Sequence, residues 1–358
     1  MRLAHALALA ATVAAFATAF TPALARAVES DFVTRDFRFG SGETLPELRL
    51  HVLTLGILRR DAKGHAANAV LVLHGTGGTG RQFLARPFAD ELYGKGQPLD
   101  TTRFFVILPD GIGHGRSSKP SDGLRMKFPH YDYDDMVRAQ HLLVTRHLGV
   151  EHLKLVMGTS MGGMHTWVWG ETFPEFMDAL MPLACQPVAI VGRNRLWRQM
   201  LVDAIRNDPE WRGGDYEREP QAGLRTAVDL LLIAGSAPID MQNSLATRDS
   251  VDRWLAAQLA RRMAATDAND LLYQVEASRH YDPSPGLGAI VAPVMFVNSA
   301  DDFINPPDLG IAEREIRRVR RGRFVLLPAS AETRGHGSHT WARLWKAHLL
   351  ELLEGNVR

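Results

Sequence analysis

The feature that most constrains this chain is a serine between two glycines, at the point where an apolar run gives way to a helical stretch. The motif Gly158–Gly162 reads Gly-Thr-Ser-Met-Gly; it follows the apolar residues 153–157 and precedes the helix-like residues 163–169. A serine at such a strand-to-helix turn has a strained backbone that exposes its hydroxyl group, and the glycines avoid clashes with Cβ atoms. The pattern predicts Ser160 as a nucleophile, and a glycine-rich turn without chemistry is the alternative.

A serine hydroxyl needs a base, and the base needs an acid that orients it. The order of motifs resembles the α/β-hydrolase fold, in which the acid and then the base follow later strands. The apolar run 292–299 is followed by Asp301 and Asp302. The usual pattern in that fold has a proline four residues after the acid, and Pro306 therefore selects Asp302. We expect Asp301 to serve as a turn or capping residue.

The base is expected after the next apolar run, 323–328, where a glycine-rich loop carries His336. A histidine on such a loop can turn its ring between the nucleophile and the acid. We expect His339, at the start of the last helix, to cap that helix or face solvent, and His74 to be structural. A metal site is disfavoured because no set of acidic or cysteine ligands accompanies these histidines. We predict neither a metal nor a cofactor.

The negative charge that develops on an attacked carbonyl needs two backbone N–H groups directed at it. Met161, directly after the nucleophile, supplies one of them. The loop 74–80, after the apolar run 69–73, supplies the other, which we assign to Thr76. This glycine-rich loop also resembles a phosphate-binding loop, but it lacks the Lys-Ser/Thr ending and the acidic residue of nucleotide-binding motifs.

The spacing of apolar runs predicts a mostly parallel sheet flanked by helices, because strands alternate with helical stretches. The expected strands before the break are 48–55, 69–73, 104–108, 153–157 and 179–183. A helix is expected over 133–147, and the last helix over 341–353. Between the two β-α regions, residues 186–285 are helical and rich in Trp, Met and Arg. We predict a core of residues 28–185 and 286–358, with residues 186–285 inserted as a helical lid over the site.

Residues 1–27 resemble a secretory signal peptide. Arg2 precedes a long run of Ala, Leu, Val and Phe, Pro22 interrupts that run, and residues 25–27 read Ala-Arg-Ala, a small-x-small cleavage pattern. The run is long enough for an uncleaved membrane anchor, but its high alanine content favours cleavage after Ala27. We expect an exported protein, periplasmic or secreted, with no membrane span after cleavage.

Charge and cysteine content exclude some other classes. The formal net charge is +1 and both signs are mixed along the chain, which gives no indication of a nucleic-acid partner. Cys185 is the only cysteine, so the chain forms no intramolecular disulfide, and we expect this residue to be buried as a small apolar side chain.

Three segments together resemble the homoserine O-acetyltransferase family. They are Asp135–Gln140, Gly158–Met164, and Ala204–Tyr216, which contains the run Asp-Pro-Glu-Trp-Arg-Gly-Gly-Asp-Tyr. The resemblance covers nearly the whole chain after the signal segment. It implies an α/β-hydrolase fold with a helical lid and a triad of Ser160, Asp302 and His336. It also implies that a homodimer joined through the lid is possible.

Two departures from the family pattern concern the substrate. The transferases follow the catalytic histidine with an aspartate for the amino group of homoserine, and this chain has Gly337. They carry an arginine for the carboxylate at a position where this chain has Val202. The segment 110–118 is closer to ordinary hydrolases. Losing both charges should abolish recognition of a zwitterion, because each charge-assisted contact contributes roughly 1.5–3 kcal/mol.

We therefore favour a serine hydrolase that cleaves a small carboxylic ester. An acyltransferase with another acceptor and a non-catalytic binding module on the same fold are the alternatives. The lid offers an apolar set suited to an adaptable wall, which predicts a preference for uncharged, apolar acyl groups. The set is Trp197, Met200, Trp211, Tyr216, Met241, Trp254 and Met263.

Overall fold

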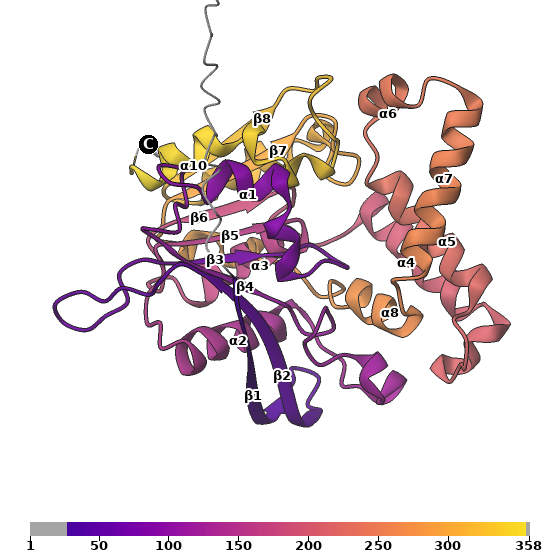
Figure 1. The fold of residues 1–358 in the computed structure, drawn as a ribbon, viewed down its shortest axis with the longest axis horizontal. Helices are drawn as coiled ribbons and strands as arrows, with labels where there is room; N and C mark the ends of the chain where they lie inside the picture. Colours follow the sequence, from indigo (N-terminus) through magenta and orange to yellow (C-terminus); the bar gives the residue numbers. More distant parts are fainter. Residues whose placement is uncertain (1–26, 356–358) are drawn as a thin grey trace, which may run out of the picture.

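The chain folds around one eight-stranded sheet, with a group of helices standing to one side of it (Figure 1). The computed structural model describes residues 27–355, so the expected signal segment lies almost entirely outside the described residues. The strand order is β1-β2-β4-β3-β5-β6-β7-β8. β1, β2 and β4 pair antiparallel, and every pair from β4 to β8 is parallel. The expected mostly parallel sheet is confirmed.

The central strands form because they are continuous apolar runs, which suit strands buried on both faces. All residues of β3, β4, β5 and β6 are buried. The strands are β1 Val28–Arg38, β2 Thr44–Leu55, β3 Ala69–Leu73, β4 Phe105–Pro109, β5 Leu155–Thr159, β6 Leu180–Leu183, β7 Val294–Ser299 and β8 Gly322–Leu327.

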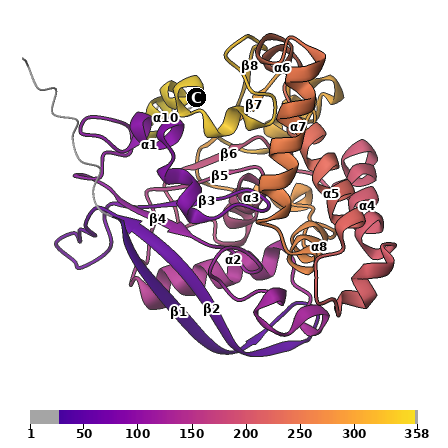
Figure 2. The same ribbon diagram turned by 45° about the vertical axis from the view of Figure 1, so that its right-hand side comes forward.

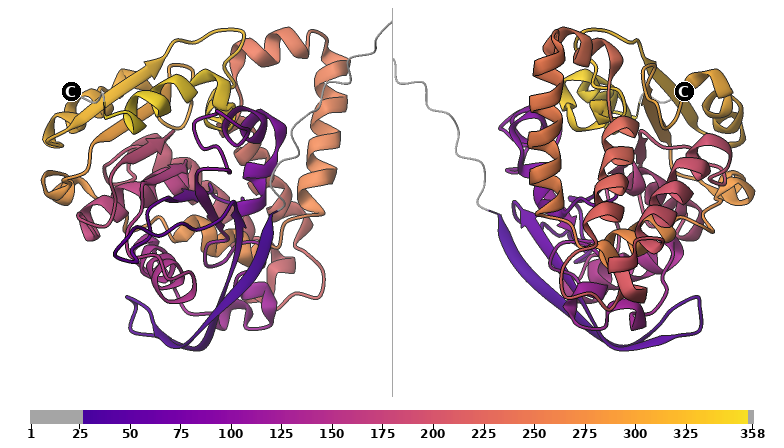
Figure 3. Two further views of the ribbon diagram at one scale, coloured as in Figure 1. Left: turned by 60° about the vertical axis from the view of Figure 1, so that its left-hand side comes forward. Right: turned by 90° about the vertical axis from the view of Figure 1, so that its right-hand side faces the viewer.

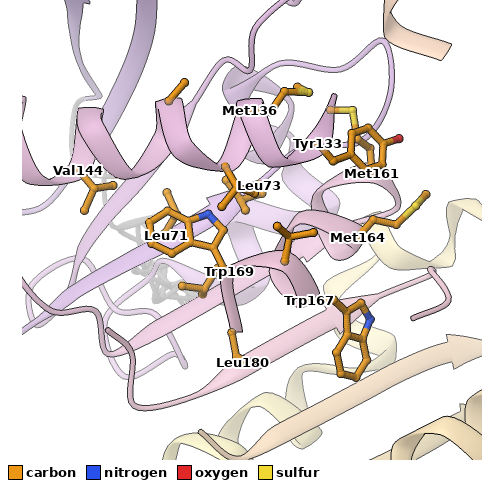
Figure 4. Close-up of a cluster of buried hydrophobic side chains, with 14 of the residues drawn as sticks. Leu71, Leu73, Tyr133, Met136, Val144, Met161, Met164, Trp167, Trp169 and Leu180 are labelled. Atoms are coloured by element: carbon orange, nitrogen blue, oxygen red, sulfur yellow. The ribbon is translucent and has the colours of Figure 1, made fainter. Parts of the chain in front are cut away.

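Helices cover both faces of the sheet. Alternate residues of β3 illustrate this: Leu71 and Leu73 belong to one apolar core with α2 and α3, whereas Val70 and Val72 belong to a second core with α1 and α10. Figure 4 shows part of the first core, with α2 and α3 lying over the strands. The helices are α1 Arg86–Leu92, α2 Tyr133–Leu142, α3 Met161–Thr172, α4 Gly192–Arg206, α5 Gln221–Ala234, α6 Pro238–Ser244, α7 Arg248–Met263, α8 Ala268–Glu276, α9 Ile311–Glu315 and α10 Lys346–Leu353.

The segment between β6 and β7 is helical, and α4 to α8 gather beside the sheet rather than on its faces (Figures 2 and 3). These helices have an apolar core of their own, which includes Leu201 and Val202 of α4, Leu224 of α5 and Leu272 of α8. We call residues 186–285 the helical segment. Phe303 and Ile304, in the loop after β7, pack against its core and connect it to the body.

Three elements differ from the expected ones. β1 was not expected, because Val28–Arg38 is mostly exposed and so has no continuous apolar run. It forms a strand by pairing with β2 over ten residue pairs. The last helix is shorter than 341–353: the chain first makes two 3₁₀ turns, Gly337–Thr340 and Ala342–Leu344, before α10 begins at Lys346. The helix expected over 133–147 is α2 followed by a π-helical turn, Leu143–His147.

Within residues 27–355 no single helix is both long and apolar enough to cross a membrane. α5 and α6 meet the length and composition limits only as a pair, and they are bent by 101° with respect to each other.

Candidate active site

Parallel strands bring four loops to one edge of the sheet. The carboxyl ends of these strands lie in register: Leu73 of β3 pairs with Gly158 of β5, and Ser299 of β7 pairs with Leu327 of β8. Functional groups in open α/β sheets gather at this edge. Thr76 follows β3, Ser160 follows β5, Asp302 follows β7, and His336 follows β8.

Ser160 lies on a strained turn between β5 and α3. Its backbone has φ 55° and ψ −114°, a conformation that L-residues rarely adopt. The turn is possible only because its neighbours lack side chains. A Cβ on Gly158 would lie 2.0 Å from the carbonyl oxygen of Gly162, and a Cβ on Gly162 would lie 2.0 Å from that of Leu73. The sharp strand-to-helix turn expected at this motif is therefore present.

The structure brings Ser160, His336 and Asp302 into one hydrogen-bonded line. His336 Nε2 lies 2.8 Å from Ser160 Oγ, and His336 Nδ1 lies 3.0 and 3.1 Å from the two carboxylate oxygens of Asp302. The carboxylate fixes the tautomer in which Nδ1 carries the proton, so Nε2 is left to accept a proton from the serine. This geometry can activate a serine for attack on a carbonyl.

Asp302 is fully enclosed and held as a carboxylate. Burial alone would raise the pKa of Asp302, but the adjacent His336 and hydrogen bonds from His336 and Asn305 outweigh it and lower this pKa below its usual value. Its oxygens accept from the backbone N–H of Ile304 at 2.8 Å and from Asn305 Nδ2 at 3.0 Å. Asn305 also donates to the carbonyl of Ala184 at 3.0 Å, which ties the acid loop to the end of β6.

Asp301 has a different part in the same loop. It does not contact the ring of His336; its carboxylate accepts from Ser299 Oγ, from Thr333 Oγ1 at 2.8 Å and from the backbone N–H of Gly335 at 3.1 Å. Asp301 thus anchors the loop that carries His336, a wider role than the local turn or cap expected from the sequence. Sequence reasoning also missed Asn305, whose spacing of three residues from Asp302 is typical of a side chain that closes a polar turn.

The loop after β3 lies directly against the serine. A Cβ added to Gly75 would lie 3.2 Å from Ser160 Cβ, so Thr76 begins beside the nucleophile. His74 holds this loop: its Nδ1 lies 2.9 Å from the carbonyl of Gly75, and its Nε2 accepts from the N–H of Gly111 at 2.9 Å. Burial lowers the pKa of His74, which keeps the ring neutral as this pairing requires. His74 is structural, as expected.

The two N–H groups assigned to the oxyanion come from elements that this geometry fixes. Met161 is the first residue of α3, where backbone N–H groups have no acceptor within the helix. Thr76 is half-buried in the loop held by His74. The assignment of these two N–H groups to the oxyanion stays a prediction.

His339 differs from expectation. Its ring is only partly exposed: it lies 5.2 Å from the ring of His336, and its Nδ1 is buried without a hydrogen-bond partner among the described residues. Burial, and then the charge of His336, lower the pKa of His339 to about 3. His339 lies in the short 3₁₀ turn Gly337–Thr340, which follows His336 directly.

The apolar side chains expected to form a substrate wall mostly serve the helical segment itself. Trp197 and Tyr216 belong to its core, Trp211, Trp254 and Met263 pack against that core, and Met200 is exposed. One charged side chain of this segment is nevertheless buried, a feature that the apolar set did not predict: Arg198 of α4 donates to Ser278 Oγ at 3.2 Å. Arg198, Val202 and Ile205 lie on one buried face of this helix.

A cavity of about 400 Å³ lies next to this arrangement. Met164 of α3, residues 186–194 and the loop from Ile304 to Ile311 line it, and Ser160 and His336 do not. No group of three or more His, Cys, Asp or Glu side chains within residues 27–355 is placed to hold a metal ion. Cys185, also buried, has its pKa raised by burial, so its thiol stays protonated.

Comparison with known proteins agrees with the fold. Residues 68–327 match the family model described as "alpha/beta hydrolase fold". A homoserine O-acetyltransferase from Geotalea uraniireducens (strain Rf4) is 31% identical over 322 residues, which is 78% of this chain and 84% of that protein.

Solved structures of two kinds superpose on the chain. The acetyl esterase MekB is 26% identical with a TM-score of 0.80, covering 91% of this chain and 97% of the other. A homoserine O-acetyltransferase from Bacillus anthracis has a TM-score of 0.78 at 21% identity, covering 93% and 99% respectively, and this likeness concerns the fold alone.

Proposed function

The chain belongs to the α/β-hydrolase fold family, as a relative of the homoserine O-acetyltransferases, and from this premise we propose that it is a serine hydrolase that cleaves carboxylic esters. The observation that carries the proposal is the hydrogen-bonded line from Ser160 through His336 to Asp302. The fold alone does not fix the function, but the aligned Ser160, His336 and Asp302 favour catalysis over a non-catalytic binding module.

The proposed reaction has two half-reactions. Ser160 Oγ attacks the ester carbonyl while its proton passes to His336 Nε2, and the backbone N–H groups of Thr76 and Met161 stabilise the oxyanion. His336 then gives the proton to the leaving alcohol, and an acyl-enzyme remains. Water attacks this intermediate with His336 as base again, which releases the acid and restores Ser160. Asp302 orients the ring and stabilises its positive charge in both halves.

Water rather than homoserine is the proposed acceptor of the acyl group. Two positions of this chain lack the charged residues that the resemblance to the homoserine O-acetyltransferases implies for recognising homoserine. Val202 is fully buried in the core of the helical segment, so its side chain packs there and is not exposed to solvent. At Gly337, by contrast, a Cβ would meet only Arg334 Cβ, at 3.6 Å. There is thus room for a Cβ atom at position 337, and steric crowding at Cβ does not explain why this chain has glycine there instead of aspartate.

Transfer to another acceptor is the second candidate, supported by the homoserine O-acetyltransferases among the relatives. Product analysis distinguishes the two. The purified protein is incubated with 4-nitrophenyl acetate, and separately with acetyl-CoA and homoserine, and acetate and O-acetylhomoserine are quantified. We expect acetate from the ester and no useful rate of O-acetylhomoserine formation. Robust O-acetylhomoserine formation would return the protein to the transferases.

We also propose that the protein is exported to the periplasm or medium and cleaved after Ala27, on the pattern of residues 1–27. N-terminal sequencing of the protein recovered from its host tests this: a chain that begins at Val28 supports it, and an intact Met1 contradicts it.

A homodimer through the helical segment is a further proposal. It is supported by large apolar side chains that this segment exposes, namely Leu196, Met200, Ile233, Ile239 and Val251. Light scattering tests it, and a monomeric mass at micromolar concentration would contradict it.

A further inference from the structure

Arg198 is a buried cation whose side-chain partners are neutral. Only 3% of its surface is exposed, and it lies on α4, in the helical segment. Its Nε donates to Asn194 Oδ1 at 2.9 Å and its Nη1 to Ser278 Oγ at 3.2 Å. Among residues 27–355, no carboxylate lies within ion-pair distance of this guanidinium. A buried charge without a counter-charge is costly, so such a group indicates a missing anion.

A second arginine adds another positive charge close to Arg198. Arg195, one turn earlier on α4, donates through Nη2 to Gln199 Oε1 at 2.6 Å, while its Nη1 is buried without an acceptor among the described residues. Burial lowers the pKa of Arg198, and the charge of Arg195 lowers it further, so the two guanidinium groups repel each other. An arginine nevertheless stays charged in proteins. An anion bound beside Arg198 would relieve both the burial and the repulsion.

Tyr133 connects this cation to the reacting serine. Its hydroxyl is buried and is directed toward Arg198, Ser278 and Thr76, but none of them makes a well-aligned hydrogen bond with it. Thr76 belongs to the loop that lies against Ser160. Figure 4 shows Tyr133 at the same end of the core as Met161, the residue after the nucleophile. The unpaired hydroxyl and the unpaired cation therefore face the same place, beside the oxyanion loop.

We propose that Arg198, supported by Ser278 and Tyr133, binds a carboxylate that the substrate carries in addition to its ester group. The proposal rests on the ester hydrolysis proposed above and names its substrate class: esters with a free carboxylate within a few bonds of the reacting carbonyl. A guanidinium binds a carboxylate through two parallel N–H groups, and the hydroxyl of Tyr133 can donate to the same anion. Arg198 is thus assigned as a specificity residue, distinct from Val202 one turn later on α4.

The carboxylate could belong to the acyl part or to the alcohol part of the ester, and two substrate pairs distinguish these sources. The first pair is 4-nitrophenyl hydrogen succinate and its methyl ester, with the charge on the acyl side. The second is O-acetyl-lactate and its methyl ester, with the charge on the alcohol side. We expect the purified full chain to prefer the charged member of one pair by roughly tenfold or more in kcat/KM, as a charge-assisted contact allows.

The Arg198→Met variant keeps an unbranched apolar side chain at this position and removes the guanidinium with its charge. We expect the ratio of kcat/KM for the charged and neutral members to fall to near one, chiefly through KM. Arg206→Met is the matched control, because Arg206 is on the same helix but pairs with Glu276 at 2.6 Å and is half-exposed; it should leave the ratio unchanged. A wild-type preference for the neutral member of both pairs overturns the proposal, as does an equal loss on both members in Arg198→Met.

If Arg198→Met does not fold, the wild-type chain and Ser278→Ala still decide. In the wild type, succinate should protect Ser160 from labelling by a fluorophosphonate, and so should succinamide. The concentration of succinate needed for this protection should be at least about tenfold lower than that of succinamide. In Ser278→Ala this difference in concentration should be smaller. Equal protection by the two compounds contradicts the proposal. Failure of ester hydrolysis itself would look different, because then no ester would be cleaved and no serine labelled.

Discussion

The body and the helical segment are built on opposite principles. The body buries continuous apolar strands between two helical layers, and its strained or charged groups are satisfied by hydrogen bonds that reach across loops, as in Asp302. The helical segment has a smaller core, and its longest helix, α7, buries only Leu259. Yet it also buries Arg198 without a counter-charge. The body thus fixes the reacting groups rigidly, whereas the helical segment carries the feature that calls for a ligand.

The two regions meet at the loop of the acid. Arg193 of α4 donates to the carbonyl of Phe303 at 2.5 Å and stacks on its ring at 4.1 Å from the centroid. Phe303 is the residue after Asp302, so the helical segment supports the loop that carries the carboxylate. The chemistry should therefore depend on the body and the choice of substrate on the helical segment, and this loop is one of the elements that both regions contact.

Replacing Ser160 with Ala should have the largest effect and separate the two regions most clearly. The hydroxyl is the proposed covalent centre, and loss of a triad member typically lowers kcat by about 10⁴–10⁶-fold. Steady-state ester hydrolysis measures it, with the circular dichroism spectrum as a control for folding. Residual activity within tenfold of the parent would contradict the assignment of the nucleophile.

The two neighbouring aspartates should differ strongly. Asp302→Asn removes the carboxylate on His336 Nδ1 and should lower kcat by about 10⁴-fold. Asp301→Asn weakens only the anchoring of the His336 loop through Thr333 and Gly335, so we expect a loss of about tenfold or less, on the scale of one neutral hydrogen bond. Parallel kinetics of the two variants check this. An equal loss, or a larger one in Asp301→Asn, would show that the wrong carboxylate was assigned.

Leu201→Ala tests whether the helical segment has a core of its own. Leu201 is fully buried there, and truncating such a leucine typically costs about 2–5 kcal/mol. Hydrogen exchange should speed up in α4 and α5 and stay unchanged in β5. The matching change in the body, Met157→Ala, should do the reverse. Equal acceleration in both regions by either variant would mean that the molecule has one cooperative core.

Acid should loosen the body before the helical segment. Burial, and then the charge of His74, lower the pKa of His165 to about 3. The folded body therefore binds no proton at His165 between about pH 6.5 and 3, whereas the unfolded chain does, so stability falls as the pH drops through this window. Each such histidine contributes about 1.4 kcal/mol per pH unit. The helical segment holds one histidine, His280, which is exposed.

Denaturant unfolding at pH 7 and pH 5 measures this effect. His165→Gln should reduce the pH dependence by about one proton, because glutamine does not titrate and can still face Gln140, whose amide nitrogen lies 3.2 Å from His165 Nδ1. An unchanged pH dependence in this variant would contradict the account of the buried histidine.

The sequence was sufficient where structure is local. Gly158 and Gly162 identified the turn because their missing side chains are a steric requirement of that turn, and the apolar runs of β3 to β6 identified the parallel sheet. It was insufficient where burial depends on distant partners. Arg198 is buried by Ser278, eighty residues later, and by Tyr133 of α2, and no local pattern encodes that meeting. β1 likewise depends on its partner strand rather than on its own composition.

The edge of the body is proposed to make Ser160 reactive through His336. This proposal is tested most directly by treating the folded protein with a fluorophosphonate and locating the adduct by peptide mass spectrometry. We expect a single adduct on the peptide that carries Ser160, formed quickly in the wild type and at least about 10³-fold more slowly in His336→Gln. An adduct on any other residue, or rapid labelling that does not depend on His336, would contradict it.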